Sequence, residues 1–539
     1  MTRPGRRCLN PESMRKLLIL AAALLSAACA EAPQPEINVI PRPLSVEQGD
    51  GAFRLGRSCP IGYDDPALQS VAALCAGYLT EEGERKPVVA DKPVHKGIDL
   101  QLDDTLAGEE YTLSATKKGV SICGGSPRAV LYGVQTLRQL IDGDRVPVVE
   151  IRDEPYFGYR GAMFDVARYF YPVEEVKRFI DIMALHKLNT FHWHLTDDQG
   201  WRIEIKRYPE LTRIGSQRRE TLIGHYKTSN EYDGKPHGGY YTQDEIREVV
   251  AYAAERCIDI IPEIELPGHS MAALASYPWL GCTKGPYEVR TTWYYSSDVL
   301  CAGRETTFEF LENVLTEVIG LFPSKYIHVG GDECPKVRWK ACPDCQRRMR
   351  REGLADEDAL QSYFVCRIEE WLHAHGREMI GWDELLEGGV TPSTIVMSWR
   401  GTEGGIEAAK LGNRVIMAPR FYFYLDYYQT SDPEKNGEPL SIGRNVPIRK
   451  LYGYDPFDRL DEAQSRNILG VQANLWTEYI STMDHAEYML LPRLAAMSEV
   501  AWATERRDYD DFVRRLGSLR GLYDREGYRY ADFVFRGIE

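Results

Sequence analysis

The sequence lacks the features that mark membrane, fibrous and nucleic-acid-binding proteins. A mean hydropathy of −0.38 and 27% charged residues exclude a multi-span membrane protein. A hydrophobic content of 43% is too high for a disordered chain, and no glycine-based or longer tandem repeat suggests a fibre or a solenoid. Long basic runs are absent and the net charge is −15, so phosphate backbones are repelled. We therefore expect no nucleic acid as a partner.

The apolar run near the N-terminus is short. It covers residues 17–25, follows two basic residues and precedes small ones, which predicts a secretory signal rather than a membrane span. Three small residues before Cys29 resemble a bacterial lipobox, although the leucine lies one place further back than usual; cleavage after Ala30 is the alternative. We expect a lipoprotein signal over 1–29 and a tether over 30–36. The protein would be exported to the periplasm or cell surface and anchored to the membrane through lipidated Cys29.

Cysteine is sparse, with 12 in 539 residues, and two of these fall in the targeting region. Disulfides are plausible in an exported chain, and Cys282 and Cys301, separated by a loop, are the expected pair. Cys334, Cys342 and Cys345 include a Cys-Pro-Asp-Cys run with the spacing of zinc ligands. Because only three cysteines lie close together and no histidine completes the set, we expect structural thiols or a disulfide, and no metal.

The first part of the mature chain predicts a small α+β domain over residues 37–153. Short β-like runs alternate there with two helical patterns, Ala67–Glu81 and Pro127–Ile141. A stretch rich in Gly, Asp and Pro over 142–155 then marks a domain boundary.

Residues 154–505 predict a (β/α)8 TIM barrel, because eight apolar strand patterns alternate with amphipathic helices. The expected strands are Tyr159–Asp165, Thr190–Leu195, Asp259–Glu263, Tyr326–Val329, Glu378–Trp382, Thr394–Trp399, Arg414–Met417 and Leu469–Asn474. The expected helices include Val173–His186, Gln243–Arg256, Glu305–Ile319, Asp358–His375 and Gly404–Leu411. A doubly wound open sheet is the alternative, but no G-x-G-x-x-G follows the first strand. Residues 506–539 are expected to form a C-terminal helix and tail packed on the barrel.

Carboxylate and tryptophan side chains follow several of these strands, at the end of the barrel where this fold places its active site. The fourth strand leads through two glycines to Asp332 and Glu333, so a tight turn would present adjacent carboxylates. Trp382, Trp399 and Trp476 lie at the ends of three further strands. They could seal the rim of the core, or they could form an aromatic-walled pocket suited to a sugar face or an acetyl methyl.

The second strand carries His192 and His194, whose side chains point to the same side. A His-x-His pair raises the alternative of a zinc-dependent amidohydrolase barrel. Such a site needs further ligands from other strand ends, where strands five and six supply tryptophan instead. We therefore expect both histidines to be packed and hydrogen-bonded.

Seven motifs together resemble glycoside hydrolase family 20, the β-N-acetylhexosaminidases, and occur in that family's order over about 159–502. They read FDVARYF, FHWHLTDDQGWR, PEIELPGHS, HVGGDE, GWDE, SWRG and LWTE. The preceding domain resembles the family's small α+β domain through INVIPRP and LYGVQTLRQLI. The resemblance implies an exo-acting, retaining enzyme without a cofactor, whose substrate is a glycan or oligosaccharide with a terminal N-acetylhexosamine.

The resemblance also implies a mechanism in which the substrate's own 2-acetamido oxygen is the nucleophile. Glu333 corresponds to the general acid and base, and Asp332 to the residue that accepts the acetamide N–H. Tyr424, in the run FYFYLDYY, corresponds to the donor to the acetamide oxygen. Trp382, Trp399 and Trp476 would line the acetyl pocket.

Further positions match residues that hold the rest of the terminal sugar. The resemblance assigns Arg160 to hydroxyls O3 and O4, and Asp426 and Glu478 to the O4/O6 edge, which accommodates either orientation of O4. Asp197 and His269 match a charged network around the acid. A non-catalytic glycan-binding lipoprotein is the remaining alternative, and the intact Asp-Glu pair argues against it.

Overall fold

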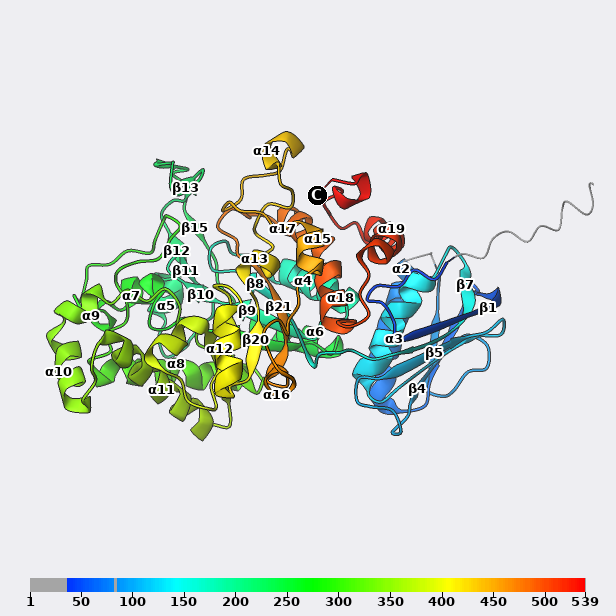
Figure 1. Ribbon diagram of the computed structural model, residues 1–539, viewed down its shortest axis with the longest axis horizontal. Helices are drawn as coiled ribbons and strands as arrows, with labels where there is room; N and C mark the ends of the chain where they lie inside the picture. The colour runs from blue at the N-terminus through cyan, green and yellow to red at the C-terminus, as the bar shows by residue number, and fades with distance from the viewer. Residues whose placement is uncertain (1–35, 82–84, 539) are drawn as a thin grey trace, which may run out of the picture.

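The computed structural model describes residues 36–81 and 85–538 as a small domain followed by a barrel (Figure 1). The predicted signal, most of the tether and Cys29 lie outside these residues. Within the described ranges, no helix is both long enough and apolar enough to cross a bilayer.

The small domain is a seven-stranded mixed sheet with the order β1-β7-β5-β6-β4-β2-β3. Its strands are β1 (Ser45–Arg54), β2 (Pro60–Tyr63), β3 (Val88–Ala90), β4 (Ile98–Leu102), β5 (Tyr111–Ala115), β6 (Val120–Gly124) and β7 (Arg145–Asp153). Alternate residues of β5 and β6 are buried, because only one face of the sheet is covered by helices. That face carries α2 (Gln69–Glu81) and α3 (Pro127–Leu140) and is turned toward the barrel (Figure 1).

Eight strands close into a barrel in the order β8-β9-β16-β17-β18-β19-β20-β21, all neighbours being parallel. They are β8 (Tyr159–Asp165), β9 (Thr190–His194), β16 (Asp259–Glu263), β17 (Tyr326–His328), β18 (Glu378–Trp382), β19 (Ile395–Ser398), β20 (Val415–Met417) and β21 (Ile468–Leu475). The predicted TIM barrel, preceded by a small α+β domain, is thus confirmed, and each strand lies where its apolar run predicts.

Helices cover the outside of the barrel between successive strands. The longer ones are α4 (Val173–Leu185), α6 (Gln243–Glu255), α8 (Glu305–Leu321), α11 (Glu357–Ala374), α12 (Glu403–Leu411), α17 (Met483–Leu490) and α18 (Arg493–Trp502). Sequence signals fix their starts; for example, Thr242 and Glu245 form a capping box at α6. Shorter helices include α5 (Glu210–Arg213), α7 (Met271–Ser276), η2 (Pro278–Leu280), α9 (Val337–Ala341), α10 (Pro343–Glu352), η3 (Asp383–Gly388), α13 (Arg420–Phe423), α14 (Pro433–Asn436), α15 (Ile448–Tyr452) and α16 (Glu462–Ser465).

Six two-residue strands lie in the single long connection between β9 and α6. These are β10 (Thr196–Asp197) with β11 (Gly200–Trp201), β12 (Gln217–Arg218) with β15 (His237–Gly238), and β13 (Leu222–Ile223) with β14 (Glu231–Tyr232). The connection leaves the carboxyl end of β9, the end of the barrel that carries the site described below.

A buried polar cluster joins the two domains. Asp153, at the end of β7, accepts hydrogen bonds from Trp502 Nε1 at 2.8 Å and Tyr111 Oη at 2.8 Å. Lys187 Nζ, which follows α4 of the barrel, lies 3.2 Å from the same carboxylate, and both side chains are wholly buried. Trp502 itself packs in the hydrophobic core of the small domain. The interface therefore combines an apolar anchor with a desolvated ion pair.

The C-terminal helix, α19 (Tyr509–Glu526), lies between the barrel and the small domain (Figure 1). Its Arg515 donates to Val39 O at 2.8 Å and pairs with Glu499 of α18 at 2.6 Å. Glu526 pairs with Arg138 of α3. The helix thus contacts both domains and not the barrel alone. The short η4 (Val534–Arg536) follows it.

Candidate active site

The two adjacent carboxylates lie on a tight turn after β17. Gly330 and Gly331 have φ values of 68° and 99°, a backbone region that favours glycine, and a Cβ on Gly330 would collide with the Glu265 carboxylate. The side chain of Asp332 is 10% exposed, whereas that of Glu333 is 35% exposed. The turn therefore presents one sheltered carboxylate and one that reaches solvent.

His269 connects these carboxylates to Asp197. Its Nδ1 lies 3.1 Å from Asp197 Oδ1, and its Nε2 lies 3.5 Å from both Asp332 Oδ2 and Glu333 Oε2. Burial alone would lower the pKa of this imidazole, but Asp197 and Asp332 hold the pKa well above 6.5. His269 is therefore an imidazolium at neutral pH. The structure thus brings together the two carboxylates and the two residues expected in a network around them.

Polar groups inside the barrel support this network from below. Glu263, at the end of β16, lies 3.0 Å from His192 Nε2 and 2.7 Å from His328 Nδ1 and accepts a hydrogen bond from Trp382 Nε1 at 2.9 Å. His194 bonds to the same carboxylate and lies 3.0 Å from Asp197 with its other nitrogen. His192 and His194 are thus packed and hydrogen-bonded, as their place in the strand predicts.

The tryptophans at the strand ends gather around Tyr424. Trp399 stacks on Tyr424 with ring centroids 6.0 Å apart, and Trp476 lies 6.2 Å from Tyr424 and 6.1 Å from Trp382. Burial, the neighbouring Tyr427 and the charge of Asp332 raise the pKa of Tyr424 well above 10, so its hydroxyl remains a donor. The four aromatic side chains form one cluster beside the Asp-Glu turn.

Hydrogen bonds to β21 and α18 hold the loop that carries Tyr424 and Asp426. Leu425 N donates to Asn474 O at 2.8 Å, which aligns the loop with β21. Arg493 of α18 donates to Leu425 O at 2.5 Å and to Tyr427 O at 3.0 Å. Burial and the nearby charge of Glu478 raise the pKa of Asp426 well above 3.8. The backbone hydrogen bonds therefore hold Asp426 where the charge of Glu478 acts on it, and the role of this pair at the O4/O6 edge stays a prediction.

Arg160 is not in this site, which corrects the assignment made from the sequence. It lies near the start of β8, at the opposite end of the barrel, and is wholly buried. Its guanidinium donates to Lys187 O at 3.0 Å, Phe157 O at 2.6 Å and Tyr132 Oη at 2.5 Å, and it pairs with Glu109 at 2.9 Å. Arg160 therefore links the barrel to the small domain and cannot reach a sugar.

Arg168 occupies the place expected for that arginine. It follows Asp165, the last residue of β8, and pairs with Asp165 at 3.1 Å and Asp197 at 2.9 Å. Its guanidinium carbon lies 4.8 Å from the ring centroid of Trp476. Arg168 is within the motif FDVARYF, so the sequence carries the signal for this residue, whereas Arg160 lies at the opposite end of the strand.

Two further side chains border the site and were not predicted. Glu384, the second acid of GWDE, accepts from Trp399 Nε1 at 2.8 Å, and burial and the charge of Asp332 raise its pKa well above 4.5. Tyr295 belongs to the long connection before α8. The hydrogen bond that its hydroxyl shares with Tyr294, burial and the charge of Glu333 raise its pKa to about 12. No motif marks Tyr295, since it lies in an irregular loop.

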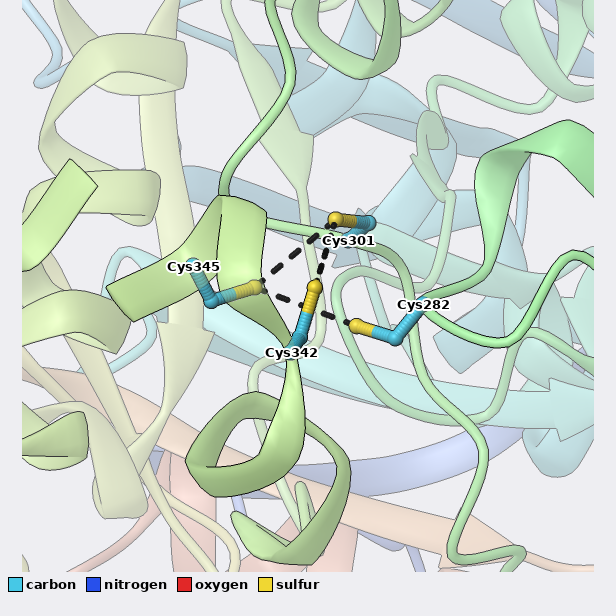
Figure 2. Close-up of side chains that lie close together, drawn as sticks. All are labelled: Cys282, Cys301, Cys342 and Cys345. Atoms are coloured by element: carbon cyan, nitrogen blue, oxygen red, sulfur yellow. Dashed lines mark hydrogen bonds between the residues drawn. The ribbon is translucent and has the colours of Figure 1, made fainter. Parts of the chain in front are cut away.

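The cysteines are arranged differently from the prediction. The expected Cys282–Cys301 disulfide is wrong, because all cysteines in the described residues are free thiols. Figure 2 shows that Cys282 and Cys301 converge with Cys342 and Cys345. Cys334, expected with the last two, is not part of this group; it is buried near His269 and Asp332, and its pKa is raised to about 12 chiefly by burial.

Comparisons with known proteins agree with this geometry. Residues 157–505 match the catalytic domain of glycosyl hydrolase family 20, and residues 36–154 match domain 2 of the same family. A β-hexosaminidase of Porphyromonas gingivalis is 44% identical over 534 residues, which covers 95% of this chain and 67% of the relative. A β-hexosaminidase of Vibrio furnissii is 39% identical and covers 86% and 76% of the two chains.

Solved structures show the same fold with sugar bound. The family 20 exo-β-N-acetylglucosaminidase of Vibrio harveyi, in complex with N-acetylglucosamine, superimposes with a TM-score of 0.82 at 34% identity, covering 92% of this chain and 78% of that one. A mutant β-hexosaminidase of Streptomyces plicatus in complex with the product N-acetylglucosamine gives a TM-score of 0.80 at 32% identity, covering 93% and 97%. The barrel, the small domain and the residues at the strand ends together place this chain in glycosyl hydrolase family 20.

Proposed function

We propose that the protein is an exo-acting, retaining β-N-acetylhexosaminidase that removes terminal, non-reducing β-linked N-acetylglucosamine or N-acetylgalactosamine from glycans. The observation that carries this proposal is the Asp332–Glu333 turn, which lies beside the aromatic cluster around Tyr424 and is bridged by His269. Acid, orienting base and aromatic cluster are the parts that substrate-assisted cleavage of an N-acetylated sugar needs.

In the first step, the acetamide oxygen of the substrate attacks the anomeric carbon while Glu333 gives its proton to the departing oxygen. The glycosidic bond breaks and a bicyclic oxazolinium ion forms, which Asp332 stabilises by accepting the acetamide N–H. Asp332 Oδ1 is suited to this task because it is buried and has no hydrogen-bond partner among the described residues. Tyr424 donates its hydroxyl to the acetamide oxygen, and the three tryptophans enclose the acetyl methyl.

In the second step, a water molecule attacks the anomeric carbon of the oxazolinium ion from the face that the leaving group has vacated. Glu333, now a carboxylate, accepts a proton from the water, and the configuration at the anomeric carbon is retained. Its 35% exposed side chain allows water to enter at this residue and not at the sheltered Asp332. Glu333 thus serves first as the acid and then as the base, while Asp332 keeps its hydrogen bond with the acetamide N–H in both steps.

The remaining polar groups bind the hydroxyls of the terminal sugar. Arg168 replaces Arg160 as the residue that holds O3 and O4, and Asp426 and Glu478 hold the O4/O6 edge. Asp426 Oδ1 is buried without a hydrogen-bond partner within the described chain, so it is available to a hydroxyl. Groups that bind the far edge of the ring leave no place for a further sugar there, which favours exo action.

The protein is also proposed to be exported and anchored to a membrane through lipidated Cys29. The support is the order of residues before this cysteine, in which two basic residues are followed by an apolar run and then by three small residues. Cells that express the full chain would carry it in the membrane fraction, and Cys29→Ala would release it into the soluble fraction. An unchanged distribution of the variant would contradict lipidation.

The activity is tested by hydrolysis of an aryl β-N-acetylglucosaminide, with and without a chelator, and of the matching aryl β-glucoside. We expect turnover of the acetamido substrate alone, no loss of rate with chelator, and competitive inhibition by a thiazoline analogue of the oxazoline. Loss of activity with chelator at an unchanged melting temperature would favour the amidohydrolase alternative, and binding without turnover would favour a glycan-binding protein. Equal rates on the glucoside would refute substrate assistance.

A further inference from the structure

We propose that Cys282, Cys301, Cys342 and Cys345 together bind one zinc ion as thiolates. The sulfur of Cys301 lies 3.7 Å from that of Cys345 and 3.8 Å from that of Cys342, and the sulfurs of Cys282 and Cys345 are 3.8 Å apart. All four sulfurs lie within 4.8 Å of one another and point to a common centre (Figure 2).

These separations are those of a tetrahedral metal site. Zinc–thiolate bonds are about 2.3 Å long, and a tetrahedron with that radius has sulfur–sulfur edges of about 3.8 Å. Two bonded sulfurs would instead lie about 2.05 Å apart. A closed set of four ligands leaves no position for water or substrate, so this zinc would be structural.

The local backbone favours thiolates at this position. Cys342 is the residue before the first turn of α10, and Cys345 is the third residue of that helix. The partial positive charge of a helix N-terminus favours the thiolate form of a cysteine placed there.

Charged and polar neighbours complete the surroundings of the cluster. Arg304 donates to Gly281 O at 3.0 Å and to Cys282 O at 3.4 Å and pairs with Asp344 at 2.7 Å, so its positive charge lies beside the sulfurs. A cation here offsets the net negative charge of a zinc ion with four thiolates. Gly303 must be glycine, because a Cβ would collide with the backbone of Asp344.

The site would join two connections that border the carboxylates. Cys282 and Cys301 enclose the loop that carries Tyr295, whereas Cys342 and Cys345 follow the turn that carries Glu333. The cluster lies at the end of the molecule opposite the small domain, near α9 and α10 (Figure 1). A metal crosslink would add to the contacts that join the two connections, such as the hydrogen bond from Trp339 Nε1 to Leu300 O at 2.9 Å, and would fix Tyr295 relative to Glu333.

The proposal is tested on the purified full-length chain by elemental analysis and by mass spectrometry of the denatured, non-reduced protein. We expect about one zinc per chain and all four cysteines as reduced thiols, which a mercurial reagent titrates with release of the zinc. A mass lower by four hydrogens would show two disulfides and overturn the proposal. Reduced thiols without bound metal, even after zinc is supplied, would overturn it as well.

Variants separate this site from other cysteines. Cys301→Ser and Cys342→Ser should lose the zinc, whereas Cys366→Ser, on α11 outside the cluster, should retain it. If the first two variants do not fold, the wild-type chain is loaded with Co²⁺ instead. Sulfur-to-cobalt charge-transfer bands with strong tetrahedral d–d absorption are expected, and their absence from a cobalt-treated, folded chain would refute four-thiolate binding.

Discussion

Arg168 and Arg160 lie at opposite ends of one strand, and the same substitution in each should have different consequences for catalysis. A guanidinium has five N–H groups. Arg168 uses three of them on Asp165, Asp197 and Gln199, at 2.9 to 3.1 Å, which leaves two for a sugar. Hydrogen bonds that involve a charged group contribute about 1.5–3 kcal/mol each, so losing both costs at least about 3 kcal/mol.

Arg168→Lys keeps the charge but not the planar fork, so we expect kcat/KM on an aryl β-N-acetylglucosaminide to fall at least about 100-fold. The melting temperature should also fall, because the buried Asp165 and Asp197 lose hydrogen bonds, so kcat/KM is the readout that separates the two arginines. Arg160→Lys should leave kcat/KM within a few-fold and lower the melting temperature, since its N–H groups are bonded to Lys187, Phe157, Tyr132 and Glu109. The reverse pattern, with catalysis lost in the Arg160 variant alone, would refute the corrected assignment.

Three further substitutions test other parts of the account. Tyr424→Phe removes a donor to the acetamide oxygen and should lower kcat about 10²-fold to 10³-fold, whereas Tyr422→Phe, packed on Tyr454, should not; equal effects would contradict the role of Tyr424. His269→Asn, in which asparagine suits the positive φ of 44°, removes an imidazolium 3.5 Å from both carboxylates. Because that positive charge favours the ionised carboxylates, the pH profile of kcat/KM should move to higher pH by about one unit, and an unmoved profile would contradict the electrostatic link. Lys187→Met breaks a fully buried ion pair and should lower the free energy of unfolding by about 3 kcal/mol. Lys325→Met, in an exposed pair, should lower it by less than about 1 kcal/mol, and similar losses in both variants would show that burial of the pair does not matter.

The barrel was predictable because parallel strands are buried on both faces and therefore read as continuous apolar runs. Most strands of the barrel follow this rule, although β9 carries His192 and His194, and Asp332, Glu333 and the tryptophans could be located by their position at or just after the end of a strand. The small domain was harder to resolve. Its seven strands, half exposed and as short as three residues in β3, carry too weak a pattern to be placed one by one.

The predictions for Arg160 and for the cysteines are wrong because tertiary packing, and not a local sequence pattern, decides which side chains meet. Arg160 and Arg168 lie near the two ends of β8, and only the direction of the strand in the barrel tells which one faces substrate. The four cysteines are spread over residues 282–345, so their convergence depends on how two loops meet. Glu263 is a buried carboxylate in a strand, and its role becomes visible only when His192, His194 and His328 surround it.

The central claim is that the substrate's own acetamide oxygen is the nucleophile, held by Asp332 and Tyr424. It is tested most directly by kcat/KM for aryl glycosides whose N-acyl group carries none, one, two or three fluorine atoms. Fluorine withdraws electrons from the acyl oxygen, so we predict that kcat/KM falls steadily along the series, while Glu333 remains the acid throughout. A rate that does not depend on fluorination would show that another group attacks the anomeric carbon, and it would contradict the account.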